Sequence, residues 1–319
     1  MAAVSSAGTH TYVLSTEVED ALHHGRPVVA LESNVIAHGY RWPENLEVAR
    51  AVERVVREGG AVPATVMVES GQVMVGADDA ALERFARSEH AAKVTRRDLG
   101  IVLAGGGLGA TSISATMAIA DQIGIRTIAS AGLGGVHRGA EHSMDISSDL
   151  TELARTELIV VCAGVKMILD AGRTLEFLET QGTPVIGFRH EQFPAFYCRD
   201  SGFPTQIRLD HPHQIAETAR RHWGFPHSGS ILVTHPIPRE DALDSARIEL
   251  AIDEALASAK DTGVVGAGIT PFVLRAVDAA TGGEARAANR AVLLSTAAAA
   301  TEIEVARATS ERGVLDGVH

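Results

Sequence analysis

The sequence predicts an α/β fold, a three-layer α/β/α sandwich around a largely parallel, mixed central sheet. Short apolar runs alternate with longer amphipathic stretches along the chain, which is the pattern of a parallel sheet covered by helices on both faces. No internal repeat, low-complexity tract or linker interrupts this alternation, and 319 residues can bury one large core. We therefore expect a single domain over residues 1–319, with flexible ends at about 1–13 and 308–319.

The elements follow in order from hydrophobic periodicity and turn residues. "RPVVALES" has the composition of a buried strand, and "ENLEVARAVERVVREGG" after it has the spacing of an amphipathic helix that two glycines end. "AVPATVMVESGQVMVG" predicts a pair of strands. Further strands are expected at residues 100–107, 125–132, 157–164, 183–188 and 229–238, and further helices at 110–124, 146–156, 165–182 and 287–308.

Composition excludes several classes of function. The chain has 40 acidic residues against 28 Lys and Arg, a formal charge of −12, so binding to nucleic acid or to an anionic membrane is not expected. No apolar run reaches the length of about 18 residues that a membrane span needs, and no signal peptide is visible, so we expect a cytoplasmic protein. Cys162 and Cys198 give no disulfide framework, and Cys162 in "LIVVCAG" is expected to be a buried, inert thiol.

Lysine is rare and therefore informative. It occurs only at Lys93, Lys166 and Lys260, whereas arginine supplies every other cation apart from histidine. Because a guanidinium stays protonated, a lysine is needed wherever the chemistry requires a neutral amine. Lys260 ends an amphipathic helix, where a cation suits the helix dipole. Lys93 and Lys166 have no such explanation.

Lys166 is predicted to open a helix directly after an apolar strand. The positive end of a helix and apolar surroundings both disfavour the ammonium form. This environment suits a lysine that attacks a carbonyl as a neutral amine and forms a Schiff base. The alternative is a stem that packs on the sheet while its ammonium reaches water, and position alone does not separate the two.

Chemically active residues follow four predicted strands at their carboxyl ends, where ligands gather in parallel sheets. They are Glu32, the glycines at 105–107, the stretch 131–150 and Lys166. Glu32 in "ALESN" suits a general acid or base, or an N-cap of the next segment. His137 is either a proton carrier or a structural histidine.

A glycine motif follows one of these strands. Gly105, Gly107 and Ala110 fit the dinucleotide fingerprint G-x-G-x-x-A, but the acidic residue expected about 20 positions further on is missing. A single phosphate at the start of the following helix, held with Thr111 and Ser112, is better supported. A tight turn without a ligand is the alternative. Walker and G-x-S-x-G motifs are absent from the sequence, which disfavours P-loop enzymes and serine hydrolases.

The stretch "AGLGGVHRGAEHSMDISSDL" combines glycines with many ionisable groups. Asp145 and Asp149 are expected one helical turn apart on the same face, at the start of the helix at 146–156. An N-cap explains part of the pattern, but Ser147, Ser148 and the first N–H groups also suit a phosphate.

The same stretch suits a divalent metal ion. A single aspartate such as Asp145, surrounded by waters, is a typical arrangement for Mg²⁺ or Mn²⁺. His137 and His142 make zinc conceivable, although the spacing H-E-x-x-H is absent.

Several motifs together resemble a known family, the pseudouridine-5′-phosphate glycosidases, also called the indigoidine-synthase-A-like family. The resemblance runs in order from about Leu14 to Ala306 and includes its longest match, "GGVHRGAEH…DIS.DL". The other matching segments are "VALES", "GAVPAT", "KVTRRDL", "GATSISATM", "VVCAGVKMILD", "PIP" and "TPFVL".

The resemblance implies a metal-dependent lyase that makes or breaks the C–C bond between C1′ of ribose 5-phosphate and an aglycone, usually uracil. It implies Lys166 as the Schiff-base lysine, Glu32 as the proton donor, and His137 and Lys93 as further catalytic residues. It also implies an α/β/α sandwich, a homotrimer and Mn²⁺, or another divalent ion such as Mg²⁺, bound by Asp145. The residues expected to contact the substrate are Lys93, Thr111, Ser112, Ile113, Arg138, Ser147, Ser148, Asp149, Asn34 and Asn289.

Departures from the family's usual sequence concentrate on the aglycone side. Where family members usually have "ESTIISHGMPYPQN", this chain has "ESNVIAHGYRWPEN", which alters Asn34 and Tyr40–Trp42. The expected imine, metal and phosphate residues are kept. Two enzymes stay open: a pseudouridine 5′-phosphate glycosidase, which Asn289 favours, and a C-ribosyl synthase for an aromatic natural product, as in alnumycin-type biosynthesis, which Tyr40–Trp42 favours. A non-catalytic sugar-phosphate-binding protein is a remote third.

Overall fold

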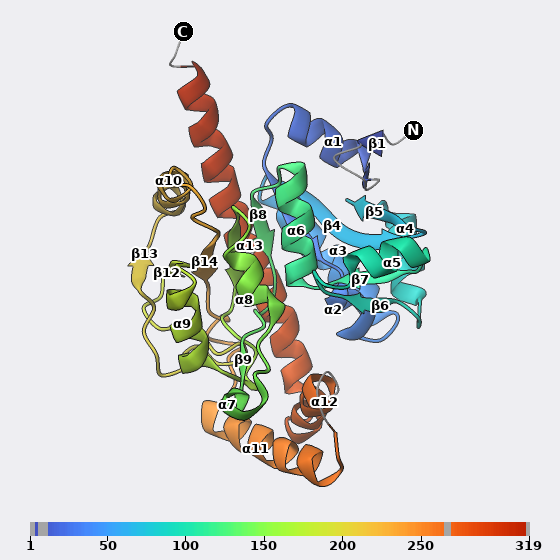
Figure 1. The fold of residues 1–319 in the computed structure, drawn as a ribbon, viewed down its shortest axis with the longest axis vertical. Helices are drawn as coiled ribbons and strands as arrows, with labels where there is room; N and C mark the ends of the chain where they lie inside the picture. Colours follow the sequence, from blue (N-terminus) through green and yellow to red (C-terminus); the bar gives the residue numbers. More distant parts are fainter. Residues whose placement is uncertain (1–3, 6–11, 265–268, 317–319) are drawn as a thin grey trace.

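A mixed sheet of twelve strands forms the centre of the protein (Figure 1). The computed structural model describes residues 4–5, 12–264 and 269–316. The strand order is β1-β2-β5-β4-β3-β8-β10-β14-β12-β13, and β7 pairs with both β4 and β6. The strands of this sheet are β1 (Val4–Ser5), β2 (Tyr12–Leu14), β3 (Val28–Glu32), β4 (Val62–Glu69), β5 (Gln72–Val75), β6 (Ala92–Val94), β7 (Gly109–Thr111), β8 (Thr127–Ala129), β10 (Ile159–Cys162), β12 (Val185–Phe188), β13 (Ile207–Leu209) and β14 (Ile231–Thr234).

The middle of the sheet is parallel. From β4 through β3, β8, β10, β14 and β12 to β13, every neighbouring pair runs parallel, whereas β5 and β7 pair antiparallel with β4. The carboxyl ends of β3, β8 and β10 therefore meet at one edge of the sheet, as the sequence predicts. A second, two-stranded sheet lies beyond that edge and consists of β9 (Val136–His137) and β11 (Leu169–Asp170).

Helices cover both faces of the sheet. In Figure 1, α6 and α8 lie on the near side of β8, and α3 and α13 lie behind the sheet. This arrangement gives the three layers that the alternating pattern predicts. The helices are α1 (Thr16–His23), α2 (Asn34–His38), α3 (Glu44–Glu58), α4 (Asp79–Arg87), α5 (Leu99–Gly105), α6 (Ile113–Ile123), α7 (Ala140–Ser143), α8 (Ser148–Leu153), α9 (Ala171–Thr180), α10 (Pro212–His222), α11 (Ser245–Asp261), α12 (Ile269–Ala280) and α13 (Glu284–Asp316).

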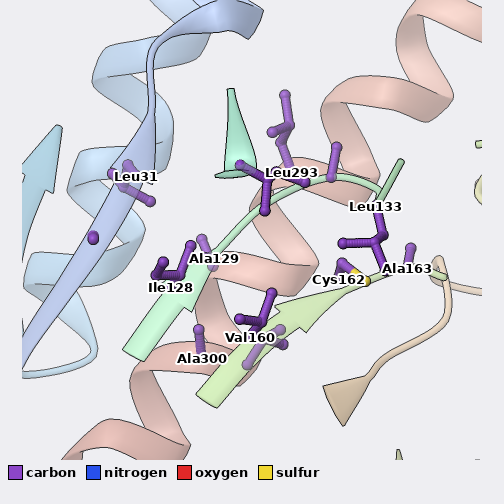
Figure 2. Packing of buried hydrophobic residues seen from close by; sticks show 14 of the residues in the cluster. Leu31, Ile128, Ala129, Leu133, Val160, Cys162, Ala163, Leu293 and Ala300 are labelled. Atoms are coloured by element: carbon purple, nitrogen blue, oxygen red, sulfur yellow. The ribbon is translucent and has the colours of Figure 1, made fainter. Parts of the chain in front are cut away.

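The core between the sheet and α13 is built from small and branched side chains, because aromatic residues make up only 4% of the chain. Figure 2 shows Leu293 and Ala300 of α13 directed at the strands that carry Ala129 and Val160. Ala300 and Val160 are completely buried. The short alanine side chains let α13 lie close to the sheet, and replacing a large buried residue here by alanine costs about 2–5 kcal/mol.

Most predicted elements are confirmed, including the strand pair at 61–76, which forms β4 and β5. Cys162 is buried and unpaired as predicted, and burial raises the pKa of its thiol to about 12. No helix of the described residues is long and apolar enough for a membrane span.

Two predicted elements are wrong. The expected strand at 100–107 is the short helix α5, whose Ile101 is 72% exposed, because a short apolar run does not by itself distinguish a strand from a helix. The dinucleotide fingerprint requires a strand directly before Gly105, and the structure has a helix there. The expected helix at 165–182 begins only at Ala171, where the Asp170 carboxylate caps it by accepting a bond from the Arg173 N–H over 2.9 Å.

The expected flexible ends fall partly outside the described residues. Tyr12 and Val13 belong to β2, and residues 308–316 belong to α13, while 1–3, 6–11 and 317–319 are not described.

Candidate active site

Glu32 and Ser130 come together at the carboxyl ends of adjacent strands. Glu32 is the last residue of β3, and Ser130 follows β8 directly. The Ser130 Oγ donates a hydrogen bond of 2.8 Å to the Glu32 Oε1. Glu32 is not the cap of α2, because Ser33 takes that position, so the N-cap alternative is wrong.

Burial raises the pKa of the Glu32 carboxyl above its usual value. The positive charge of Lys166, the Ser130 hydrogen bond and Lys93 oppose this rise, and the negative charge of Asp149 adds to it. A raised pKa favours the protonated carboxyl, which suits a proton donor.

Lys166 lies in a turn beyond β10 and does not open a helix. Its backbone N–H donates to the Leu133 carbonyl over 3.2 Å, and its own carbonyl accepts from the Leu169 N–H over 2.9 Å. The turn depends on Gly164, which has a φ of +74°, and where a Cβ would lie 1.9 Å from the Pro194 carbonyl oxygen. The helix-dipole argument for Lys166 is therefore wrong. The charge of Lys166 nevertheless acts on the Glu32 carboxyl.

Lys93 projects from β6 into the same group of charges. Its side chain keeps access to solvent, yet partial burial lowers the pKa of its ammonium, and the neighbouring charge of Lys166 lowers it further. The carboxylates of Asp149 and Glu32 act in the opposite direction. Two of the three lysines thus share one site, as the sequence suggests.

Asp149 is the buried anion at the centre of this group. Its Oδ1 accepts from the Ser114 N–H over 3.0 Å, and its Oδ2 accepts from the Gly134 N–H over 2.9 Å. A Cβ on Gly134 would lie 2.2 Å from the Ser147 Oγ, so the glycine is required for this close approach. The carboxylate joins the starts of α6 and α8 to the 134–135 segment, and the substrate contact that we expect of it stays a prediction.

Serine hydroxyls line the junction of α6 and α8. The Oγ atoms of Ser112 and Ser114 lie 3.1 Å apart, and those of Ser114 and Ser148 lie 3.0 Å apart. The Arg96 N–H also donates to the Ser114 Oγ over 3.3 Å. Sequence reasoning missed Ser114, although "TSIS" at a predicted helix start was the available signal.

Thr111 contributes no free hydroxyl to this junction. It is completely buried, and its Oγ1 donates to the Val66 carbonyl over 2.7 Å. Ile113, the first residue of α6, is also buried. Contacts from these two residues to a ligand therefore depend on their backbone.

His137 and Asp145 lie next to each other: His137 ends β9, and Asp145 precedes α8. The His137 Nδ1 is 3.8 Å from an Asp145 carboxylate oxygen, and the His137 N–H donates to the Asp145 carbonyl over 3.0 Å. Asp145 lies outside α8, and its side chain is 43% exposed whereas Asp149 is buried, so the prediction that they share a helix face is wrong.

The donor set at Asp145 fits a hydrated Mg²⁺ or Mn²⁺, because these ions are held by one or two carboxylates and keep several waters. Among the residues that the structure describes, no three His, Cys, Asp or Glu side chains converge as a zinc site requires. His142 is exposed.

Arg138 is bound to α11 rather than directed at the other site residues. Its guanidinium donates to Glu249 over 2.8 Å, to Asp253 over 3.2 Å and to the Met167 carbonyl over 3.1 Å. Through the Met167 carbonyl the side chain holds the turn around Lys166, and the substrate contact that we expect of it stays a prediction.

The two asparagines expected to contact the substrate lie on α13 and α2. The Asn289 Nδ2 on α13 donates to the Tyr40 hydroxyl over 2.9 Å. The Asn34 Oδ1, at the start of α2, is buried and has no hydrogen-bond partner among the described residues.

Two hollows border the site. One of about 30 Å³ lies behind Glu32 and is lined by Ser130, Leu293 and apolar residues of α3. The other, of about 600 Å³, lies behind the Lys166 turn and is lined by Val165, Met167 and α11. Neither is lined by Lys93 or Lys166, so the larger hollow is not the centre of the chemistry.

The chain is similar to known proteins over most of its length. Residues 17–306 match the family described as Indigoidine synthase A like protein. A pseudouridine-5′-phosphate glycosidase of Dickeya dadantii is 50% identical over 292 residues, 92% of this chain and 92% of the relative. Another such enzyme, of Caldanaerobacter subterraneus subsp. tengcongensis, is 48% identical over 92% of this chain and 95% of the relative's length.

Two solved structures have the same fold. The crystal structure of the prealnumycin C-glycosynthase AlnA in complex with ribulose 5-phosphate superimposes with a TM-score of 0.90 at 41% identity, covering 96% of this chain and 99% of that one. An indigoidine synthase A-like protein from Thermotoga maritima superimposes with a TM-score of 0.82 at 33% identity, covering 88% and 93%. The match over residues 17–306 and these relatives show that the chain belongs to the indigoidine synthase A-like family.

Proposed function

We propose that this protein is a C-glycosidic lyase that interconverts pseudouridine 5′-phosphate with uracil and ribose 5-phosphate. One observation carries the proposal: the charges of Glu32 at the end of β3, Lys93 in β6 and Lys166 in the turn beyond β10 interact as a single group. The pseudouridine-5′-phosphate glycosidases at 48–50% identity support the choice of substrate.

The reaction needs an electron sink, because a C–C glycosidic bond is not cleaved by protonating an oxygen. In the opened sugar, the Lys166 amine attacks the C1′ aldehyde of the pentose, water leaves, and a protonated imine forms. The imine nitrogen accepts the electron pair in the direction of synthesis, when an aglycone carbon attacks C1′. In cleavage, the Lys166 amine displaces the ring oxygen at C1′, and its proton passes to that oxygen as the ring opens. The nitrogen lone pair then expels the aglycone carbon to form the imine, the Glu32 proton goes to that carbon as the C–C bond breaks, and water releases ribose 5-phosphate from Lys166.

The phosphate end of the substrate is assigned to Lys93 and the Ser112–Ser148 hydroxyls. The start of α6 supplies N–H groups in addition, since the N-terminus of a helix attracts anions. Asp149 contributes by fixing this end of α6 through the Ser114 N–H.

Asp145 is the residue that would hold Mn²⁺ or Mg²⁺, with His137 beside it. When bound, such an ion supplies positive charge and oriented waters at the sugar. Isothermal titration of Mn²⁺ into the protein tests the assignment, because Asp145→Asn should abolish binding whereas Asp253→Asn on α11 should not.

Borohydride trapping tests the central step. Incubation with ribose 5-phosphate, reduction and mass spectrometry should give one pentose phosphate adduct on Lys166. An unmodified Lys166 would exclude the imine mechanism and leave a sugar-phosphate-binding protein. Uracil release from pseudouridine 5′-phosphate, compared with Lys166→Ala, then tests the substrate.

The second candidate is a C-ribosyl synthase for an aromatic natural product. The likeness to the prealnumycin C-glycosynthase favours it, as does Trp42, which is 40% exposed in the altered loop after α2. Adduct formation on Lys166 without uracil release would favour this candidate over the glycosidase.

We also propose the homotrimer that the family resemblance implies. Light scattering after gel filtration should then give three times the 33.5 kDa of one chain.

A further inference from the structure

Glu152 is a buried carboxylate that the proposed reaction does not use. It lies on α8, four residues after Ser148, so the two side chains share one face of the helix. The Glu152 side chain is only 4% exposed, and its Oε1 lies 3.4 Å from the Arg96 Nε. The Arg155 guanidinium, just after α8, lies 4.0 Å from the other carboxylate oxygen. A buried carboxylate requires compensating charges of this kind.

Arg96 belongs to the loop between β6 and α5. Burial raises the pKa of the Glu152 carboxyl, and the charges of Arg96 and Arg155 oppose this rise. The backbone N–H of Arg96 donates to the Ser114 Oγ over 3.3 Å. Arg96 therefore binds the loop to α8 through its guanidinium and to α6 through its backbone.

The strand before this loop carries Lys93, three residues before Arg96. β6 has only three residues, and among the described residues it pairs with β7 alone. The Val94 carbonyl at its end accepts from the Ser112 N–H over 2.8 Å, on the same side as β7. The ion pair with Glu152 is thus a second attachment, on α8, of the chain that carries Lys93.

We propose that Glu152 is a positioning residue for the phosphate end of the substrate. Through Arg96 it holds the end of β6, and with it the Lys93 ammonium, beside the serine hydroxyls at the junction of α6 and α8. The proposal rests on the lyase function above and on the assignment of the phosphate to Lys93. Loss of the ion pair should weaken binding of the phosphorylated sugar and leave the chemistry at Lys166 intact.

The test compares Glu152→Gln with the wild-type protein, because glutamine keeps the size of the side chain and removes its charge. In the direction of synthesis, with uracil in excess, the KM for ribose 5-phosphate should rise about 5-fold, whereas kcat should stay unchanged. Borohydride trapping on Lys166 should shift in the same way. Half-maximal adduct formation should need about 5-fold more ribose 5-phosphate, and the maximum should stay the same.

A double-variant cycle shows whether Glu152 acts through Lys93. Lys93→Ala should raise the same KM, and adding Glu152→Gln to it should raise the KM no further. Arg96→Gln should match Glu152→Gln, because it removes the other partner of the ion pair. Arg97→Gln is the matched control, since the Arg97 side chain is 84% exposed and pairs with the adjacent Asp98. It should leave both KM and kcat unchanged.

Three results would overturn the proposal: an unchanged KM in Glu152→Gln, a fall in kcat without a rise in KM, or a further rise in KM when Glu152→Gln is added to Lys93→Ala. If Glu152→Gln does not fold, Arg96→Gln decides instead, and a KM equal to that of Arg97→Gln refutes the proposal. Wild-type protein that forms no adduct with ribose 5-phosphate refutes the lyase function itself, which is a distinguishable result.

Discussion

The Ser130 hydroxyl donates a hydrogen bond of 2.8 Å to the Glu32 carboxyl. Burial raises the pKa of this carboxyl, and the Ser130 hydrogen bond lowers it. Ser130→Ala removes a donor to the charged form, so the pKa of Glu32 should rise further. If Glu32 donates a proton during cleavage, the alkaline limb of the kcat/KM profile should move to higher pH. A limb that stays in place or moves to lower pH would contradict the role of Glu32.

Glu32→Gln should separate stability from activity. Since the folded pKa lies above the usual 4.5, the stability that this proton contributes is fully present below about pH 4.5 and is lost as the pH rises through the folded pKa. Glutamine has no such loss, so the Tm of Glu32→Gln relative to wild type should increase with pH. Thermal unfolding at several pH values measures this difference in Tm, and a difference that decreases as the pH rises would contradict the raised pKa of Glu32.

The same variant should cleave pseudouridine 5′-phosphate about 100-fold or more slowly, as expected for a lost general acid.

The three lysines should give three different results. Lys166→Ala should abolish the borohydride adduct, and Lys93→Ala should raise the KM of the phosphorylated substrate by about 10-fold or more, as loss of a hydrogen bond from a charged group does. Lys260→Ala, at the end of α11, is the matched control and should leave both unchanged. Adduct mass and initial rates distinguish the cases; an adduct on Lys93 in wild type would reverse the assignment.

Gly134→Ala should destabilise the site without changing its net charge. The new Cβ would lie 2.2 Å from the Ser147 Oγ and 2.7 Å from an Asp149 oxygen, and such overpacking costs about 1–3 kcal/mol. Gly100→Ala in α5 meets nothing within 4 Å and should be neutral or stabilising. Urea denaturation of both variants measures the contrast, and equal midpoints would refute the close packing.

The fold and the centre of the site were predictable because periodicity and strand ends depend on local sequence. "VVALES" places Glu32 at a strand end with no long-range information. The rarity of lysine identifies Lys93 and Lys166 for a chemical reason that holds wherever the chain folds. The orientation of the parallel strands then brings these residues together.

Other features depend on partners that local sequence does not name. Arg138 follows a candidate histidine and looks like a ligand residue, yet α11 supplies the carboxylates of Glu249 and Asp253 that bind it. Asp149 looks like a surface helix acid, but it is buried because the N–H groups of Ser114 and Gly134 meet it there. Long-range hydrogen bonds decide both cases.

The helix α13 links buried alanines of the core to Asn289 near its start. Its 33 residues extend over about 50 Å, and it rests on the sheet through the completely buried Ala297 and Ala300. A larger side chain at either position would push α13 away from the sheet and would displace Asn289, which lies near the start of the helix. Core substitutions that never contact the substrate are therefore expected to shift a residue that we expect to contact it.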